Sequence, residues 1–280
     1  MSGRRAFVTG WPIAHSRSPM IHRTWLRAFG IPGHYDPIAV RPEDLADFLA
    51  GLKGRGLAGG NVTIPYKEAA FAAVSRRDAA AEAIGAVNTL WFEGDTLVGG
   101  NTDAYGFAAN LDERLAGWRD AETALVLGAG GAARAVVHAL REAGIGRIAI
   151  VNRSEDRARD VAADFGCSVS GHGLNEEAAL LGACDLLVNT RPSSKAGSDG
   201  SGTIPDLKLL PGHALVTDIV YVPVETPFLS AARARGLRSA DGLGMLLHQA
   251  VPGFERWFDR RPVVGTDLRA ALERDIADAG

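Results

Sequence analysis

Residues 123–135 have the sequence TALVLGAGGAARA, an apolar run followed by a glycine-rich turn. The apolar run is typical of a buried parallel strand. The turn has the pattern G-x-G-x-x-A: Gly128 permits a tight turn, Gly130 lets backbone N–H groups approach a pyrophosphate, and Ala133 allows close helix packing. The helix expected over residues 132–143 then offers unpaired N–H donors and a partial positive charge to phosphate. This strand–turn–helix pattern predicts a dinucleotide site.

The rest of the chain predicts two α/β units, because strand and helix patterns alternate on both sides of this segment. Before it, strands are expected near residues 6–9, 35–40, 58–62, 87–92 and 96–98, and helices near 18–29, 42–52, 65–74 and 103–115. After it, strands are expected near residues 147–151, 185–189 and 214–220, and helices near 155–165 and 266–279. A further helix begins near Asp241, and we expect it to return to the first unit.

The composition is that of a globular protein without an unusual charge balance. The 280 residues are 46% hydrophobic and 22% charged, with a formal net charge of −3. Slight acidity without a long basic run argues against nucleic acid as a partner. Cys167 and Cys184 are too few for a disulfide framework or a zinc site. Neither a signal peptide nor an apolar window of about 18 residues is found, so we expect a soluble, cytoplasmic protein with no membrane partner.

Two hydroxyl side chains, those of Ser16 and Ser18, lie within the segment GWPIAHSRSP at residues 10–19. Hydroxyl donors beside a helix N-terminus suit a small carboxylate. Ser18 also suits the N-cap of the following helix, with Pro19 as its first residue. Capping and ligand binding are both open at this point, and they are compatible.

Lys67 is expected in the first turn of the helix that follows GGNVTIPYK at residues 59–67. The helix dipole disfavours a cation there by about 0.3–1 kcal/mol, although Glu68 offsets part of that cost. An ammonium beside a reacting carbonyl would stabilise developing oxyanion charge and could supply a proton. Lys67 is therefore a catalytic candidate, and the alternative is an ordinary solvated lysine.

Amide and carboxyl side chains stand at the ends of other expected elements. Asn88 begins a strand in GAVNTL, and Asn101 and Asp103 lie in GGNTD, where a hairpin ends and a helix begins. Glycines beside Asn and Asp mark close approach to a ligand. Taken alone, Asp103 is equally well explained as an N-cap.

Basic residues follow the strand expected over residues 147–151. An NAD site usually has an acidic residue about 20 positions after the glycine-rich turn, to bind the ribose hydroxyls. Here Asn152 and Arg153 occupy the strand end, and Arg153 with Arg157 could pair with a 2′-phosphate. That pattern favours NADP, whereas Glu155 favours NAD. A capped surface helix would explain the mixed charges but not the missing acid.

Seven segments, in the same order, resemble the shikimate dehydrogenase family over nearly the whole chain. They are GWPIAHSRSP, GGNVTIPYK, GAVNTL, GGNTDAYGF, LGAGGAARA, DIVYVPVETPFL and DGLGMLLHQA. The resemblance implies an α/β substrate domain over residues 1–105 and a Rossmann-type NADP-binding domain over residues 106–240. It also implies that the C-terminal helices of residues 241–280 pack on the substrate domain.

The same resemblance implies roles for individual residues and no metal. Lys67 and Asp103 would be the catalytic pair, and Ser16 and Ser18 would hold the substrate carboxylate. The substrate shell would be completed by Thr63, Asn88, Asn101, Tyr221 and Gln249. The cofactor would be bound by Gly128, Ala129, Gly130, Gly131, Ala132, Asn152, Arg153, Ser154, Arg157, Gly242 and Met245.

The implied activity is reversible reduction of 3-dehydroshikimate to shikimate with NADPH, in the biosynthesis of aromatic amino acids. Two alternatives are a quinate/shikimate dehydrogenase that uses NAD, and a catalytically silent protein that binds a related ligand. The expected oligomeric state is a monomer or a homodimer.

The chain departs from the family pattern at two places. Arg23 follows His22 where the family commonly has Asn. The loop NTRPSSK at residues 189–195 replaces the usual N-T-T-P-x-G-M, with Arg191, Ser194 and Lys195 at the changed positions. The added cations would either contact phosphate or face water.

Overall fold

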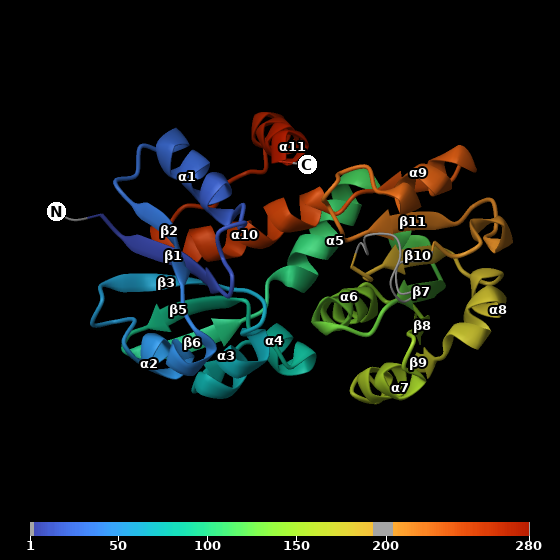
Figure 1. Cartoon of the computed structure of the whole chain (residues 1–280), viewed down its shortest axis with the longest axis horizontal. Coiled ribbons are helices and arrows are strands. Elements are labelled where there is room, and N and C mark those ends of the chain that lie inside the picture. Colours follow the sequence, from blue (N-terminus) through green and yellow to red (C-terminus); the bar gives the residue numbers. More distant parts are fainter. Residues whose placement is uncertain (1–2, 193–203, 280) are drawn as a thin grey trace. The chain divides into compact units, whose positions relative to one another are not determined.

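The computed structural model describes residues 3–192 and 204–279, which form two compact units (Figure 1). Each unit combines two stretches of the chain. Unit 1 comprises Met1–Thr102 and Leu247–Leu272, and unit 2 comprises Asp103–Leu246 and Glu273–Gly280. None of the helices within the described ranges is long and apolar enough to cross a membrane.

The sheet of unit 1 is mixed. Its strand order is β2-β1-β3-β5-β6-β4. β1 pairs in parallel with β2 and β3, whereas β5 is antiparallel to both β3 and β6. The strands are β1 (Arg5–Gly10), β2 (His34–Ala39), β3 (Leu57–Val62), β4 (Arg76–Arg77), β5 (Thr89–Glu93) and β6 (Thr96–Gly100).

Short helices and a C-terminal helix accompany this sheet. The helices are α1 (Ser18–Ala28), α2 (Leu45–Ala50), which follows the 3₁₀ turn η1 (Pro42–Asp44), α3 (Lys67–Ala73) and α4 (Ala79–Ile84). The second stretch of unit 1 contains most of α10 (Leu243–Phe258) and the start of α11 (Thr266–Ala279). Trp257 Nε1 donates to the carbonyl of Leu90 at 2.8 Å, which attaches α10 to β5. This bond joins the second stretch of unit 1 to its sheet.

The sheet of unit 2 is entirely parallel, with the strand order β12-β11-β10-β7-β8-β9. Numbered from β7, this is the 3-2-1-4-5-6 order of the Rossmann fold, read from the other edge. The order reverses between β7 and β10, and ligands bind in such sheets at the carboxyl ends beside that reversal. The strands are β7 (Thr123–Leu127), β8 (Arg147–Val151), β9 (Val169–His172), β10 (Leu186–Asn189), β11 (Leu215–Asp218) and β12 (Arg238–Ala240).

The helical elements of unit 2 precede these strands or connect them. They are α5 (Asp103–Arg114), η2 (Trp118–Asp120), α6 (Gly131–Glu142), α7 (Glu155–Ala163), η3 (Leu174–Glu176), α8 (Glu177–Leu181), η4 (Leu207–Leu209) and α9 (Pro227–Ala234). Leu125, Leu187 and Val216, from three neighbouring strands, are fully or almost fully buried in one apolar cluster. Such apolar runs are what a parallel strand covered on both faces requires.

The structure agrees with the expected strand over 147–151 and helix over 266–279, and it corrects other expectations. The helix expected from Pro65 begins at Lys67, and the helix expected over 42–52 is a 3₁₀ turn followed by α2. Ser18 is the first residue of α1, and Arg17 occupies the N-cap position. The sequence patterns did not predict α4, α8, α9, β4, β9 and β12. β9 (VSGH) and β12 (RSA) lack the apolar run that identifies a buried strand.

Candidate functional site

The glycine-rich turn of unit 2 joins β7 to α6. Gly128 has φ +106°, and a Cβ there would lie 2.7 Å from Thr190 Oγ1, so only glycine is accommodated without strain. Gly130 is the N-cap residue of α6 and Gly131 its first residue. Among the described residues, and apart from the adjoining backbone, no heavy atom lies within 4 Å of the Cβ position of either glycine. The first turn of α6, which includes Ala132, therefore offers backbone donors to an anion at an open surface.

A cavity of about 310 Å³ lies at this turn. It is lined by Gly128, Ala129, Gly130, Asn152, Arg153, Ser154, Arg157, Leu174, Thr190, Arg191 and Pro192. The structure thus brings together the glycine-rich turn and the basic residues that follow β8. Gly242 and Met245, also predicted for the cofactor, lie elsewhere in unit 2, before and within the first turn of α10.

The basic side of the cavity is fixed by the start of α7. Ser154 is the N-cap of α7, and its Oγ accepts from the N–H of Arg157. Arg157 Nε donates to the carbonyl of Ala129 at 2.9 Å, which ties the helix to the glycine-rich turn. Glu155 forms an ion pair with Arg159 and is not among the described residues that line the cavity. The guanidinium groups of Arg153 and Arg157 therefore dominate the charge on this side.

The cavity is also lined by residues that the cofactor prediction did not include. Thr190 Oγ1 donates to the carbonyl of Leu127 at 2.8 Å. Arg191 lies 2.6 Å from Glu177 in a largely buried ion pair, so its side chain does not simply face water. Leu174 was missed because β9, which precedes it, was not predicted. Ser194 and Lys195 lie outside the described residues.

The backbone of Lys67 adjoins the segment that contains Asn88 in unit 1. Lys67 is the half-buried first residue of α3, and its carbonyl accepts from Val87 N at 2.9 Å, directly before Asn88. Asn88 is 3% exposed, and its Oδ1 accepts from Thr89 Oγ1 at 2.8 Å and from Thr102 N at 2.9 Å. The position of this amide is therefore set by several donors at once.

Asn101 and Thr63 adjoin the same region. Asn101 Nδ2 donates to the carbonyl of Ala86 at 3.0 Å. Thr63 follows directly after Val62, whose N–H donates to the carbonyl of Asn88 at 2.8 Å. Gln249 is buried on α10, within the second stretch of unit 1.

Tyr35 and Asn61, which the sequence analysis did not single out, link the serines to this amide cluster. Ser16 Oγ accepts from the N–H of Ser18 at 3.4 Å, and the Ser18 side chain lies beside Tyr35, where it lowers the pKa of the Tyr35 hydroxyl. The Tyr35 hydroxyl donates to Asn61 Oδ1 at 2.6 Å, and Asn61 Nδ2 donates to the Asn88 carbonyl at 3.1 Å. Burial raises the pKa of Tyr35 well above its usual value, so the hydroxyl stays neutral.

Asp103 and Tyr221 belong to unit 2. Asp103 is the first residue of α5 and follows Thr102 directly in the chain. Tyr221 is half-buried in the loop after β11. Within the described ranges, no group of three or more His, Cys, Asp or Glu side chains is arranged to hold a metal ion.

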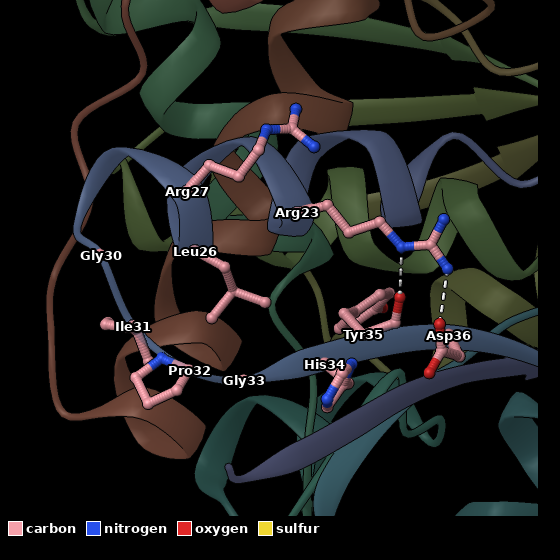
Figure 2. Close-up of a pocket in the computed structure, with 10 residues that line it drawn as sticks. All are labelled: Arg23, Leu26, Arg27, Gly30, Ile31, Pro32, Gly33, His34, Tyr35 and Asp36. Atoms are coloured by element: carbon pink, nitrogen blue, oxygen red, sulfur yellow. Dashed lines mark hydrogen bonds and ion pairs between the residues drawn. The ribbon is translucent and has the colours of Figure 1, made fainter.

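A second cavity, of about 350 Å³, lies in unit 1 between α1 and β2 (Figure 2). Figure 2 shows Arg23 reaching from α1 to the strand, where Nε donates to the carbonyl of Tyr35 at 2.9 Å and Nη2 pairs with Asp36 at 2.5 Å. Arg23, which departs from the family pattern, therefore fastens α1 to the strand that carries Tyr35.

Comparisons with known proteins match most of the chain. Family models match residues 8–90 (shikimate dehydrogenase substrate binding domain), 111–196 (shikimate / quinate 5-dehydrogenase) and 242–272 (shikimate 5′-dehydrogenase C-terminal domain). A shikimate dehydrogenase (NADP(+)) of Brucella melitensis is 56% identical over 99% of this chain and 96% of its own length.

Solved structures give the same result. Shikimate 5-dehydrogenase of Thermus thermophilus, in complex with NADP(H) and shikimate, is 36% identical, with a TM-score of 0.82 over 99% of this chain and 100% of that chain. Quinate dehydrogenase of Corynebacterium glutamicum, in complex with NAD, is 28% identical, with a TM-score of 0.86 over 96% and 98%.

Proposed function

Because this chain belongs to the shikimate dehydrogenase family, we propose that it catalyses the reversible reduction of 3-dehydroshikimate to shikimate with NADPH. The reaction is a step in the biosynthesis of aromatic amino acids. The observation in this chain that carries the proposal is the cavity of unit 2, in which a glycine-rich helix start meets Arg153 and Arg157. In this proposal unit 1, with its C-terminal stretch, is the substrate domain and unit 2 is the cofactor domain.

The residues of the cavity suit NADP. Open space over Gly130 and Gly131 leaves room for a pyrophosphate against the first turn of α6. Arginine pairs well with phosphate, and Arg153 and Arg157 occupy the place where NAD enzymes have an acid for the ribose hydroxyls. Asn152 and Ser154 would complete the 2′-phosphate site, with Gly242 and Met245 near the nicotinamide. The cofactor, when bound, supplies the hydride.

The polar residues of unit 1 suit a cyclic acid with hydroxyl groups. Ser16 and Ser18 would donate to its carboxylate. Thr63, Asn88 and Asn101, with Gln249 and with Tyr221 from unit 2, would bind the hydroxyls. The multiple bonds to Asn88 support this role, because a binding group fixed by its neighbours loses little entropy when it binds.

Lys67 and Asp103 would act on the ketone. As negative charge develops on the carbonyl oxygen, the Lys67 ammonium stabilises it and donates a proton. Asp103 accepts hydrogen bonds from the substrate hydroxyls and keeps Lys67 charged. A cation at the first residue of α3 is unfavourable for that helix, which supports a functional reason for its presence.

A steady-state comparison of two cofactors and two substrates tests the proposal. The ratio kcat/KM should favour NADP⁺ over NAD⁺ and shikimate over quinate. Lys67→Ala should lower kcat far more than it raises KM, since its contact forms in the transition state. Near-normal kcat in this variant would remove Lys67 from the chemistry.

A preference for NAD⁺ with quinate would instead identify an NAD-dependent quinate/shikimate dehydrogenase. The similarity to the NAD-bound quinate dehydrogenase favours this alternative, whereas the pairing of Glu155 with Arg159 weakens it. Tight ligand binding without turnover would identify a silent binding protein.

Location and assembly complete the proposal. We place the enzyme in the cytoplasm, a reducing compartment that suits its two free cysteines, Cys167 and Cys184. It would act as a monomer or homodimer, and light scattering of the purified protein would distinguish these states.

A further inference from the structure

Asp218 is a buried carboxylate at the carboxyl end of β11, with 1% of its surface exposed. Its Oδ1 accepts from Asn189 Nδ2 at 2.9 Å and from Val220 N at 3.0 Å. Its Oδ2 accepts from Thr226 Oγ1 at 2.7 Å. Three donors from separate parts of unit 2 therefore converge on one side chain.

The first donor, Asn189, is part of the turn that lines the cofactor cavity. Asn189 ends β10, and its Oδ1 also accepts from the N–H of Arg191 at 3.2 Å. Thr190 and Arg191, the next two residues, line the cavity and adjoin the Cα of Gly128. A bond from Asp218 to Asn189 thus fixes the amide that shapes this turn.

The other two donors lie at the two ends of the loop over residues 220–226. Val220 begins this loop directly before Tyr221, and Thr226 ends it as the N-cap of α9, with Oγ1 accepting from the N–H of Leu229. Gly242 also adjoins this point, because a Cβ there would overlap the backbone of Ile219 and lie 2.8 Å from the carbonyl oxygen of Asp218.

We propose that Asp218 is a positioning residue that holds the cofactor-lining turn at Asn189–Arg191 and the Tyr221 loop in one fixed arrangement. The inference rests on the proposed function, which assigns these two segments to cofactor and substrate. An ionised carboxylate suits this place because it only accepts hydrogen bonds and has room for all three donors. An amide would turn an N–H either toward Asn189 Nδ2 and Val220 N, which cannot accept, or toward Thr226 Oγ1, which already accepts from the N–H of Leu229.

Burial is the cost of this arrangement. It raises the pKa of Asp218, and the bonds from Thr226, Val220 and Asn189 offset only part of the effect. An apolar side chain would avoid this cost, but it would leave the donors of Asn189, Val220 and Thr226 unpaired. The loops it holds supply the reason for keeping it.

Asp218→Asn, Thr226→Val and Thr226→Ser test the proposal, with Asp185→Asn as a matched control. Asp185 also accepts several bonds, from Glu122 N, Thr123 N, Thr123 Oγ1 and His213, but at the amino end of the same sheet. For each variant, NADP⁺ affinity is measured by calorimetry, KM and kcat for shikimate by steady-state assay, and stability by thermal unfolding.

Asp218→Asn should weaken NADP⁺ binding and raise the KM for shikimate together, each by about tenfold. Thr226→Val should raise the KM for shikimate and leave NADP⁺ affinity near that of the wild type. Thr226→Ser should restore KM, because it keeps the hydroxyl. Asp185→Asn should lower the unfolding temperature and leave both ligand constants within about twofold of wild type.

Asp218→Asn overturns the inference if it lowers the unfolding temperature but leaves NADP⁺ affinity and KM unchanged. If that variant does not fold, equal KM values for the two Thr226 variants overturn it instead. A wild-type protein that neither binds NADP⁺ nor oxidises shikimate would contradict the proposed function. NADP⁺ binding without turnover leaves the cofactor half of the inference testable by calorimetry alone.

Discussion

The two ends of the parallel sheet in unit 2 each contain an aspartate that joins neighbouring segments. The pKa values of these two carboxyl groups are shifted in opposite directions. At the amino end, burial raises the pKa of Asp185, but bonds from His213, Thr123 and the Glu122 N–H outweigh it and bring the pKa below its usual value. At the carboxyl end, burial of Asp218 prevails over its hydrogen bonds, and the pKa is raised.

This difference separates residues that stabilise the fold from residues that shape the sites. Asp185 stabilises the fold, because it joins the start of β7 to the chain just before β10. Asp218, buried and with a raised pKa, joins loops at the carboxyl end, where parallel sheets bind their ligands. Substitutions at the carboxyl end should therefore alter ligand constants, and those at the amino end should alter unfolding.

Gly128→Ala should show the largest effect. The substitution forces alanine to φ +106° and its Cβ toward Thr190 Oγ1, which is itself bonded to Leu127. Strain of about 1–3 kcal/mol, added to displacement of the turn, should weaken NADP⁺ binding on the order of 100-fold. Calorimetric titration with NADP⁺ measures this loss.

Gly146→Ala is the matched control, because Gly146 precedes β8 at the amino end of the sheet. A Cβ there would lie 3.6 Å from the carbonyl oxygen of Glu122, an ordinary contact distance. This variant should bind NADP⁺ like the wild type. An equal loss of NADP⁺ affinity in Gly128→Ala and Gly146→Ala would contradict the difference between the carboxyl and amino ends of the sheet.

Arg153→Ala should have the next largest effect on NADP⁺ affinity. Arg147→Ala is its control, because these two arginines lie at opposite ends of the same strand. Arg147 begins β8, and Arg153 lies just beyond its carboxyl end in the cofactor cavity. Loss of a charge-assisted bond to phosphate should weaken NADP⁺ binding about tenfold and leave NAD⁺ binding nearly unchanged. Arg147→Ala should change neither, as equilibrium titrations with both cofactors would show. A parallel loss of NAD⁺ affinity in Arg153→Ala would contradict a role at the 2′-phosphate.

The sequence predicted the parts of this fold whose signal is local. The glycine-rich turn, the missing acid after β8 and the segments around Lys67 and Asn88 are each recognisable within a few residues. Asp218 stood inside a recognised segment, yet its role depends on β10 being the neighbour of β11, which strand order alone determines. Tyr35 and Asn61 were missed for the same reason, because their bond joins residues far apart in sequence.

The smallest expected effect is on the pH dependence of the unfolding free energy in acid. This dependence is also the most direct test of the opposite pKa shifts of Asp185 and Asp218. The folded pKa of Asp185 is lowered, so its ionised form contributes stability above its unfolded pKa, and that contribution is lost as the pH falls through the folded value. The folded pKa of Asp218 is raised, so the native state takes up that proton first and gains relative stability as the pH falls. In the acid range around the usual aspartate pKa, Asp185→Asn should therefore flatten the decline in unfolding free energy below that pKa, and Asp218→Asn should steepen the decline above it. Urea titrations across that range measure both slopes, and a change of the same sign in the two variants would contradict the assignment of opposite roles to the two ends.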